Sequence, residues 1–137
     1  MTDADSSSPT PSRTPRRLPM AVFVGATLVL LTATHWPQPS LPPMPGGDKT
    51  IHVLAYLVWG LTACGAVPRG TSRGASALVV GVGGAVLGAV DEVTQGIPGI
   101  NRSPDFLDWV ADCAGVATAI GVWAGVRFLA RGKGAHA

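Results

Sequence analysis

Three short stretches of the sequence gather side chains that can move protons or bind anions, and each stretch borders an apolar run. They hold Asp48, Lys49, His52 and Tyr56 in the first stretch, Asp91, Glu92 and Gln95 in the second, and Arg102, Asp105, Asp108 and Asp112 in the third. Lys49, His52 and Tyr56 are spaced i, i+3, i+7, so a helix carries them on one face. The three acids of the third stretch repeat this spacing, which predicts an acidic stripe on a second helix.

This combination of side chains suits general acid–base chemistry beside an anion-binding group. His52 is the candidate base, with Asp91 or Glu92 as its orienting partner. Lys49 and Arg102 form a candidate anion clamp. The further substrate-binding candidates are Tyr56, Gln95 and Asp108, and the supporting residues are Asp48 and Asp112. Neither a cofactor nor a metal is part of this prediction, and the sequence contains no Gly-x-Ser-x-Gly, phosphate-binding glycine loop or His-Glu-x-x-His motif.

Some of these residues also have a purely structural interpretation. Asp48 follows two glycines and Asp105 follows Pro104, so each could cap or begin a helix. A helix bundle can also use buried ion pairs only to fix helix register. That interpretation is weakest for carboxylates that lie a turn or more inside an apolar run, because a charge at mid-membrane depth costs about 2.5–3.5 kcal/mol. These carboxylates are Asp91, Glu92 and Asp112.

The composition is that of a membrane protein. Of the 137 residues, 47% are hydrophobic and 13% are charged, and the mean hydropathy is +0.34. Soluble domains carry about 25% charged residues, so much of this surface does not face water. The net charge of +2 and the lack of a basic stripe exclude a nucleic-acid partner.

Four apolar runs position the polar stretches. They cover about 18–36, 50–67, 74–95 and 106–130, and each approaches the ~20 residues that a helix needs to cross a bilayer. None alternates as a barrel strand does, so we expect an all-α, four-helix transmembrane domain over 18–131. Residues 1–17 are predicted to be a disordered cytoplasmic tail and 132–137 a second cytoplasmic tail. Small residues spaced four apart, which allow membrane helices to pack closely, occur at Gly84 and Gly88 and at Gly121 and Gly125.

The distribution of Lys and Arg predicts that both termini are cytoplasmic. Eight of these residues fall on one side of a four-helix zigzag, namely Arg13, Arg16, Arg17, Arg69, Arg73, Arg127, Arg131 and Lys133. Only Lys49 and Arg102 fall on the other side, where the three polar stretches also lie. The polar site therefore faces outside. A cleaved signal peptide is the alternative for the first run, but the run is long for that role. The best cleavage site ends at Ala33 and has the bulky Leu31 two positions before it, where a small residue is required.

The order and spacing of the polar residues resemble the VanZ-like family of small membrane proteins. The resemblance covers about 48–121 and rests on Asp48-Lys49-x-x-His52-x-x-x-Tyr56, Asp91-Glu92-x-x-Gln95, and Arg102 leading to Asp108 and Gly115. The family usually has Asn where this chain has Asp112, so the chain carries one extra carboxylate there. The resemblance implies a role at the cell envelope, associated in the family with reduced susceptibility to teicoplanin-type antibiotics.

The expected function is therefore action on a cell-envelope or lipid-linked component at the outer face of the cytoplasmic membrane. Membrane lipids, and a lipid-linked cell-wall precursor among them, are the expected partners, and the oligomeric state is left open. The alternatives are an acid–base hydrolase or transferase on a lipid head group, and a structural bundle or partner-binding subunit. A metal site ranks last, because no tight ligand motif supports it. Its candidate ligands are His52, Asp91, Glu92 and Asp108.

Overall fold

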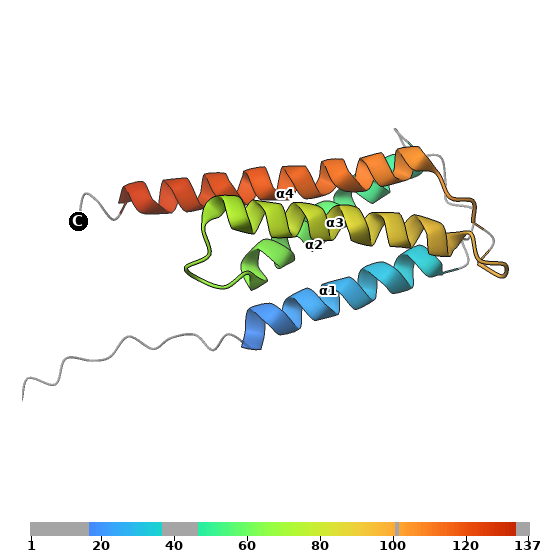
Figure 1. The fold of residues 1–137 in the computed structure, drawn as a ribbon, viewed down its shortest axis with the longest axis horizontal. Coiled ribbons are helices and arrows are strands. Elements are labelled where there is room, and N and C mark those ends of the chain that lie inside the picture. The colour runs from blue at the N-terminus through green and yellow to red at the C-terminus, as the bar shows by residue number, and fades with distance from the viewer. Residues whose placement is uncertain (1–16, 37–46, 101, 134–137) are drawn as a thin grey trace, which may run out of the picture.

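A computed structural model describes residues 17–36, 47–100 and 102–133, and the described chain is helical with no strand. The helices are α1 (Arg17–His35), α2 (Asp48–Ala66), α3 (Arg73–Gln95) and α4 (Phe106–Lys133), which lie roughly along one another (Figure 1). Their bounds differ from the predicted ones by at most three residues. The predicted N-terminal tail, apart from Arg17, and residues 134–137 of the C-terminal tail lie outside the described residues.

Local signals explain where the helices begin and end. The Ser72 hydroxyl oxygen accepts a hydrogen bond from the backbone N–H of Ala75 at 3.2 Å, which satisfies a free donor at the start of α3. An Asp105 carboxylate oxygen accepts from the N–H of Leu107 at 2.8 Å and so caps α4, as the sequence allowed. Asp48 is the first residue of α2 and does not cap it, because Gly47 occupies the cap position without a side-chain bond.

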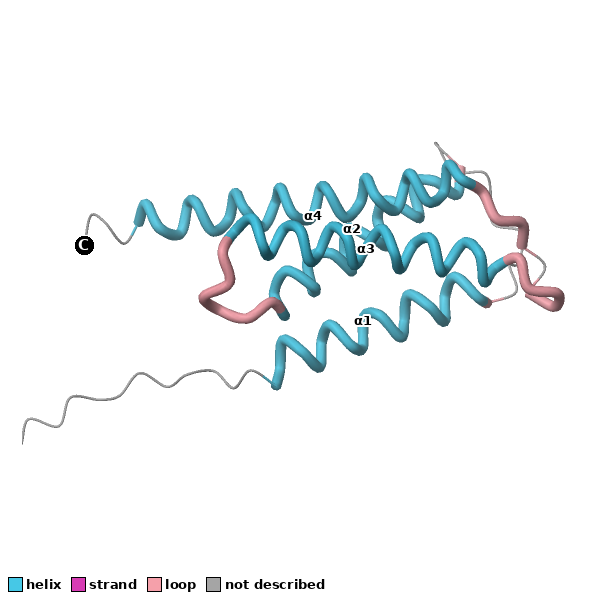
Figure 2. Tube along the Cα trace, in the orientation of Figure 1, coloured by secondary structure: helices cyan, strands magenta, loops and turns pink. Residues whose placement is uncertain are grey.

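α2 is the inner helix of the bundle. It packs most extensively against α4 and also contacts α1 and α3, while α3 packs mainly against α4. Figure 2 shows α2 running among the other helices, with α1 diverging from the group at one end. The core formed by α2 and its neighbours centres on Tyr56, Trp59, Val80 and Val116, all of which are buried.

The outward faces of the other helices are apolar. Exposed side chains include Val29 on α1, Leu78 and Val86 on α3, and Phe128 on α4. Three helices, α1, α3 and α4, are long and apolar enough to cross a membrane. α2 is not among them, since its first turns carry charged and polar residues, of which His52 and Tyr56 are buried in the bundle.

Glycines set the closest approaches between the helices. A Cβ at Gly115 would collide with the backbone carbonyl oxygen of Val53 and lie 2.9 Å from the backbone nitrogen of Leu57, so α4 lies directly against α2 there. Gly84 and Gly88 also face close neighbours, whereas a Cβ at Gly121 or Gly125 would meet nothing within 4 Å. The first predicted small-residue pair therefore packs against other helices, and the second does not within the described chain.

We expect Gly115→Ala to lower the free energy of unfolding by about 1–3 kcal/mol, the usual range for an overpacked contact, because backbone atoms cannot move aside. Gly121→Ala is the matched control in the same helix. It should leave stability unchanged or raise it, since alanine favours a helix more than glycine does. Thermal unfolding of the purified protein in detergent measures both changes. Equal effects of the two substitutions would contradict the assigned contact.

Candidate functional site

The predicted site residues meet at one end of the bundle. There α1 and α3 end and α2 and α4 begin, so the four helices bring polar side chains together although these lie far apart in the sequence (Figure 1). The buried polar residues are Thr34, His52, Asp91, Glu92, Gln95, Asp108 and Asp112. Every one of them lies toward this end, and elsewhere the interior of the described bundle is mainly apolar.

His52 and Asp112 form the innermost polar contact. The Nδ1 atom of His52 on α2 lies 2.8 Å from a carboxylate oxygen of Asp112 on α4, and both side chains are buried. An ionised carboxylate can only accept a hydrogen bond, so with Asp112 ionised Nδ1 carries the proton and Nε2 faces the rest of the site. The expectation that Asp91 or Glu92 orients His52 is therefore wrong in detail, because Asp112 holds that position.

Lys49 is held by acids of α4 and the loop before it. Its Nζ lies 2.8 Å from both Asp105 Oδ2 and Asp108 Oδ1, and 3.7 Å from Asp48 Oδ1. The Lys49 ammonium donates hydrogen bonds to both Asp105 and Asp108, and its bond to Asp105 lowers the pKa of that carboxyl group. The ammonium is thus neutralised locally, and the geometry does not support its predicted part in an anion clamp.

Asp91 belongs to a separate network on the α1 side. One of its oxygens accepts a hydrogen bond from the Thr34 hydroxyl at 2.7 Å and lies 3.4 Å from His35 Nδ1. The other accepts from the Gln95 amide at 3.3 Å. The other ring nitrogen of His35 lies 2.8 Å from the Thr94 hydroxyl. Thr34 and His35 were missed in the sequence, although their place at the C-terminal end of the first apolar run was a signal.

Glu92 connects α3 to the start of α4. One carboxylate oxygen accepts a hydrogen bond from the backbone N–H of Asp105 at 2.9 Å. The second oxygen, Oε1, is buried and has no hydrogen-bond partner among the described residues. A buried polar atom without a partner costs free energy, so this oxygen marks a point where the site is incomplete by itself.

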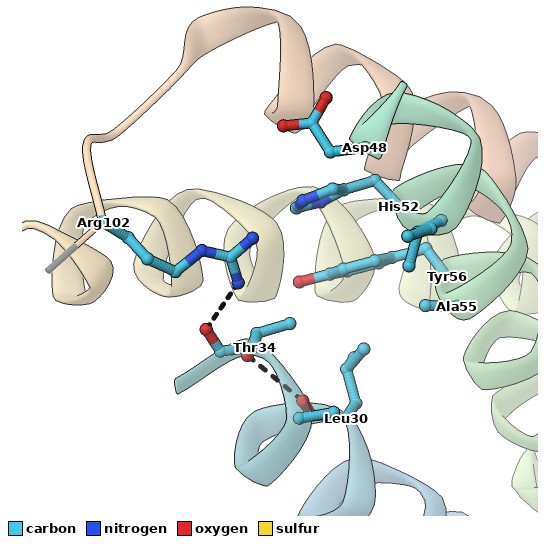
Figure 3. Close-up of a pocket in the computed structure, with 9 residues that line it drawn as sticks. Leu30, Thr34, Asp48, His52, Ala55, Tyr56 and Arg102 are labelled. Atoms are coloured by element: carbon cyan, nitrogen blue, oxygen red, sulfur yellow. Dashed lines mark hydrogen bonds between the residues drawn. The ribbon is translucent and has the colours of Figure 1, made fainter. Parts of the chain in front are cut away.

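Arg102 reaches across the open side of the site. Its guanidinium donates a hydrogen bond to the backbone carbonyl oxygen of Thr34 at 2.8 Å, near the C-terminal end of α1 (Figure 3). The last carbonyls of a helix lack partners within the helix and carry partial negative charge, which favours a cation there. This contact holds the guanidinium at the mouth of a pocket and leaves its other donors available.

The pocket has a volume of about 160 Å³ and lies between the ends of α1 and α2. The imidazole of His52, the hydroxyl of Tyr56 and the guanidinium of Arg102 point into it (Figure 3). Tyr56 has no exposed surface, and its hydroxyl has no hydrogen-bond partner within the described chain. Of the predicted site residues, those outside the pocket lining are Lys49, Asp91, Glu92, Gln95, Asp108 and Asp112.

An apolar groove continues from this pocket along the seam between α1 and α2. It has a volume of about 420 Å³ and shares Leu30, Ala33, Ile51 and Ala55 with the polar pocket. Farther from the polar end, the groove is lined by exposed or half-buried aliphatic side chains, such as Leu54. A polar pocket and an apolar groove therefore adjoin on one face of the protein.

No protein-family model, curated protein or solved structure matches this chain. The resemblance to the VanZ-like family therefore stays a prediction that rests on the spacing of the polar residues. Three of the four candidate metal ligands do converge, because one ligand atom each of His52, Glu92 and Asp108 lies within 4.8 Å of the others. Asp91 is not a member of this group.

We expect His52→Ala to destabilise the protein by at least about 1–3 kcal/mol, the cost of leaving a buried acceptor without its donor, because Asp112 then loses the hydrogen bond from the imidazole. The double variant His52→Ala/Asp112→Ala should recover most of that loss. His35→Ala is the control and should cost less, because its carboxylate neighbour Asp91 keeps hydrogen bonds from Thr34 and Gln95. A double-mutant cycle on thermal unfolding gives the coupling, and strictly additive effects would show that the two side chains do not depend on each other.

Proposed function

We propose that this chain is a VanZ-like integral membrane protein that binds a lipid-linked component of the cell envelope at the outer face of the cytoplasmic membrane. The observation that carries the proposal is the junction of the polar pocket with the apolar groove on the α1–α2 seam. An amphiphile needs both features in contact, with one part of the site for its head group and another for its chain.

The polar pocket suits a small anionic group. At about 160 Å³ it has the room of about five water molecules of ~30 Å³ each, which is enough for a phosphate-sized group. Arg102 supplies a planar set of donors that matches phosphate oxygens. The Tyr56 hydroxyl and the His52 imidazole approach from the opposite wall and supply further hydrogen bonds.

The apolar groove suits a hydrocarbon chain. Its lining side chains include Val29, Leu54 and Val58, which are exposed at the surface of the bundle and would face lipid in a membrane. A lipid could therefore enter sideways from the bilayer, with its head group passing Ala33 to reach the pocket. This route needs no channel through the protein.

Acid–base chemistry on the bound head group is the second candidate function. The buried contact between His52 and Asp112 favours it, because a carboxylate on Nδ1 fixes the ring and leaves Nε2 as a base or acid. His52 also lines the pocket, so its ring reaches the space where the head group would bind. This candidate and simple binding share one site and differ in whether the head group is altered.

The proposed topology has four spans with both termini in the cytoplasm. The end of the bundle opposite the site carries Arg17, Arg69, Arg73, Arg127 and Arg131, in agreement with the rule that cytoplasmic ends are basic. We place α2 as the fourth span because it contacts all three other helices and buries His52 and Tyr56 of its first turns among them.

We expect single cysteines at Ser103 and Ser72 to be labelled from opposite sides of the membrane. Both positions are exposed, one beside the site and one in the α2–α3 turn. With Cys64 and Cys113 replaced by alanine, a membrane-impermeant maleimide should label position 103 in intact cells and position 72 only after permeabilisation. Labelling in the reverse pattern would invert the proposed orientation.

The function is tested by closing the groove and by removing the guanidinium separately. Ala33→Phe should block the seam, and Arg102→Ala should weaken head-group binding by about 10–100-fold, the loss expected for a charge-assisted hydrogen bond of 1.5–3 kcal/mol. Neither change leaves a buried charge without its partner. The measurements are the lipids that co-purify with the protein and the teicoplanin susceptibility of cells with and without it.

Two matched variants control for general damage. Ala114→Phe adds the same bulk on an exposed position of α4, and Arg127→Ala removes a guanidinium at the opposite end of the bundle. Both should keep the bound lipid and the phenotype at normal membrane abundance. If all four variants behave alike, or if the phenotype follows abundance alone, the protein is a structural bundle. A head group that is altered, and not only bound, would establish the enzymatic alternative.

A further inference from the structure

We infer that His52, Glu92 and Asp108 form a binding site for a divalent transition-metal cation of the zinc or manganese type. A ring nitrogen of His52 and one carboxylate oxygen from each acid lie within 4.8 Å of one another, and all three side chains are buried. The three residues come from α2, α3 and α4, so the site exists only where these helices meet. One imidazole and two carboxylates are an ordinary ligand set for such ions.

The two carboxylates each have one oxygen fixed by a neighbour. Asp108 Oδ1 accepts a hydrogen bond from Lys49 at 2.8 Å, and Glu92 Oε2 accepts one from the backbone N–H of Asp105 at 2.9 Å. These bonds orient the carboxyl groups and leave Asp108 Oδ2 and Glu92 Oε1 for another partner. Metal-binding carboxylates in proteins are held by outer hydrogen bonds in this way.

The imidazole is held in the same manner. His52 Nδ1 contacts Asp112 at 2.8 Å, and Nε2 lies 3.8 Å from Asp108 Oδ2. A histidine that binds a metal commonly donates its other ring N–H to a carboxylate, which fixes the ring and makes the ligand nitrogen more basic. Asp112, which the sequence marked as an extra acid, therefore has a defined part as the support of His52.

The carboxylate oxygen Glu92 Oε1 gives independent support for a bound ligand at this site. This oxygen is buried and has no hydrogen-bond partner within the described residues, and the residue is only 6% exposed. A carboxylate in such a place needs a cation or a donor. Lys49 is already engaged by Asp105 and Asp108, so it does not supply one.

The charge of the surroundings points to a cation as well. The carboxylates packed together at this end are Asp91, Glu92, Asp105, Asp108 and Asp112, whereas the lysine and arginine side chains there are Lys49 and Arg102. A divalent ion would offset this excess of negative charge. The ligand atoms lie within 4.8 Å of one another, and side-chain movement would bring them to the ~3.3 Å edge of a tetrahedral zinc site.

The role of the cation rests on the proposed function. His52 belongs both to the ligand set and to the lining of the polar pocket, so we place the cation next to the head group. It would supply positive charge to a phosphate oxygen, and a coordination position that the three residues leave open could accept that oxygen. The substrate class this favours is a lipid that carries a phosphate next to its chain.

The test is metal binding by the untagged full-length protein in detergent. After treatment with EDTA, the protein is titrated with zinc and with manganese chloride by calorimetry, and bound metal is counted by mass spectrometry. We expect one ion per chain. Glu92→Gln and Asp108→Asn should each weaken its affinity at least tenfold, since even loss of an outer-shell partner weakens metal sites by about 10–100-fold.

Asp91→Asn is the matched control for Glu92→Gln, because it neutralises the neighbouring buried carboxylate on the same helix without removing a proposed ligand. It should change the affinity by less than threefold. Gel filtration verifies that each variant is folded, and a zinc-dependent rise in melting temperature of the native chain gives a readout that needs no variant.

Absence of stoichiometric binding by the native chain would overturn the site. Binding that survives both Glu92→Gln and Asp108→Asn would also overturn it. The two proposals fail separately. A protein that binds no metal but loses its lipid in Arg102→Ala disproves the cation alone, and a protein that binds metal without retaining lipid disproves the proposed function alone.

Discussion

The Asp112 carboxylate has no exposed surface and lies inside a bundle whose outer faces are apolar, so its charge has to be balanced from within the protein. His52 satisfies this carboxylate with a hydrogen bond across the α2–α4 contact. The 2.8 Å contact requires the two helices to lie close together, and Gly115, one turn beyond Asp112, permits this by placing α4 directly against the backbone of α2. Helix packing and site geometry are therefore one constraint, because a change that separates α2 from α4 also separates the buried pair.

The same constraint explains why the inner helix is the one that is not apolar enough by itself to cross a membrane. Polar side chains near the start of α2 would be costly against lipid, and contacts with α1, α3 and α4 remove them from it. The apolar faces of the other helices remain outside, where a membrane accommodates them without cost. The buried part of the polar end opens along the α1–α2 seam, where the pocket and the groove adjoin, and Asp48, Lys49 and Asp105 remain partly exposed.

The helices and the end of the bundle that holds the site were predictable from the sequence, because hydrophobic length and Lys/Arg distribution are local properties. The partners within the site were not. Periodicity shows that His52 and Lys49 share a helix face, but not which acids they meet. Asp112 became the partner of His52 because Gly115 brings α4 closest to α2, and this close approach depends on backbone contacts that no spacing rule reveals. Spacing also could not show that Asp91, which was expected beside His52, instead accepts a hydrogen bond from the Thr34 hydroxyl.

Asp112 also links the two proposals. Members of the VanZ-like family, which this chain resembles, usually have Asn at this position. An amide can hold the imidazole ring but adds no negative charge. A carboxylate on Nδ1 increases the basicity of Nε2 and strengthens its bond to a cation. This carboxylate also adds to the negative potential at the pocket. Without a cation, that potential would repel an anionic head group, because Arg102 is the only lysine or arginine among the residues that line the pocket. An extra acid beside an anion-binding pocket is therefore unfavourable by itself. It becomes favourable when a divalent ion is bound, because Asp112 supports the ligand His52 and the ion offsets the negative charge and binds the head group.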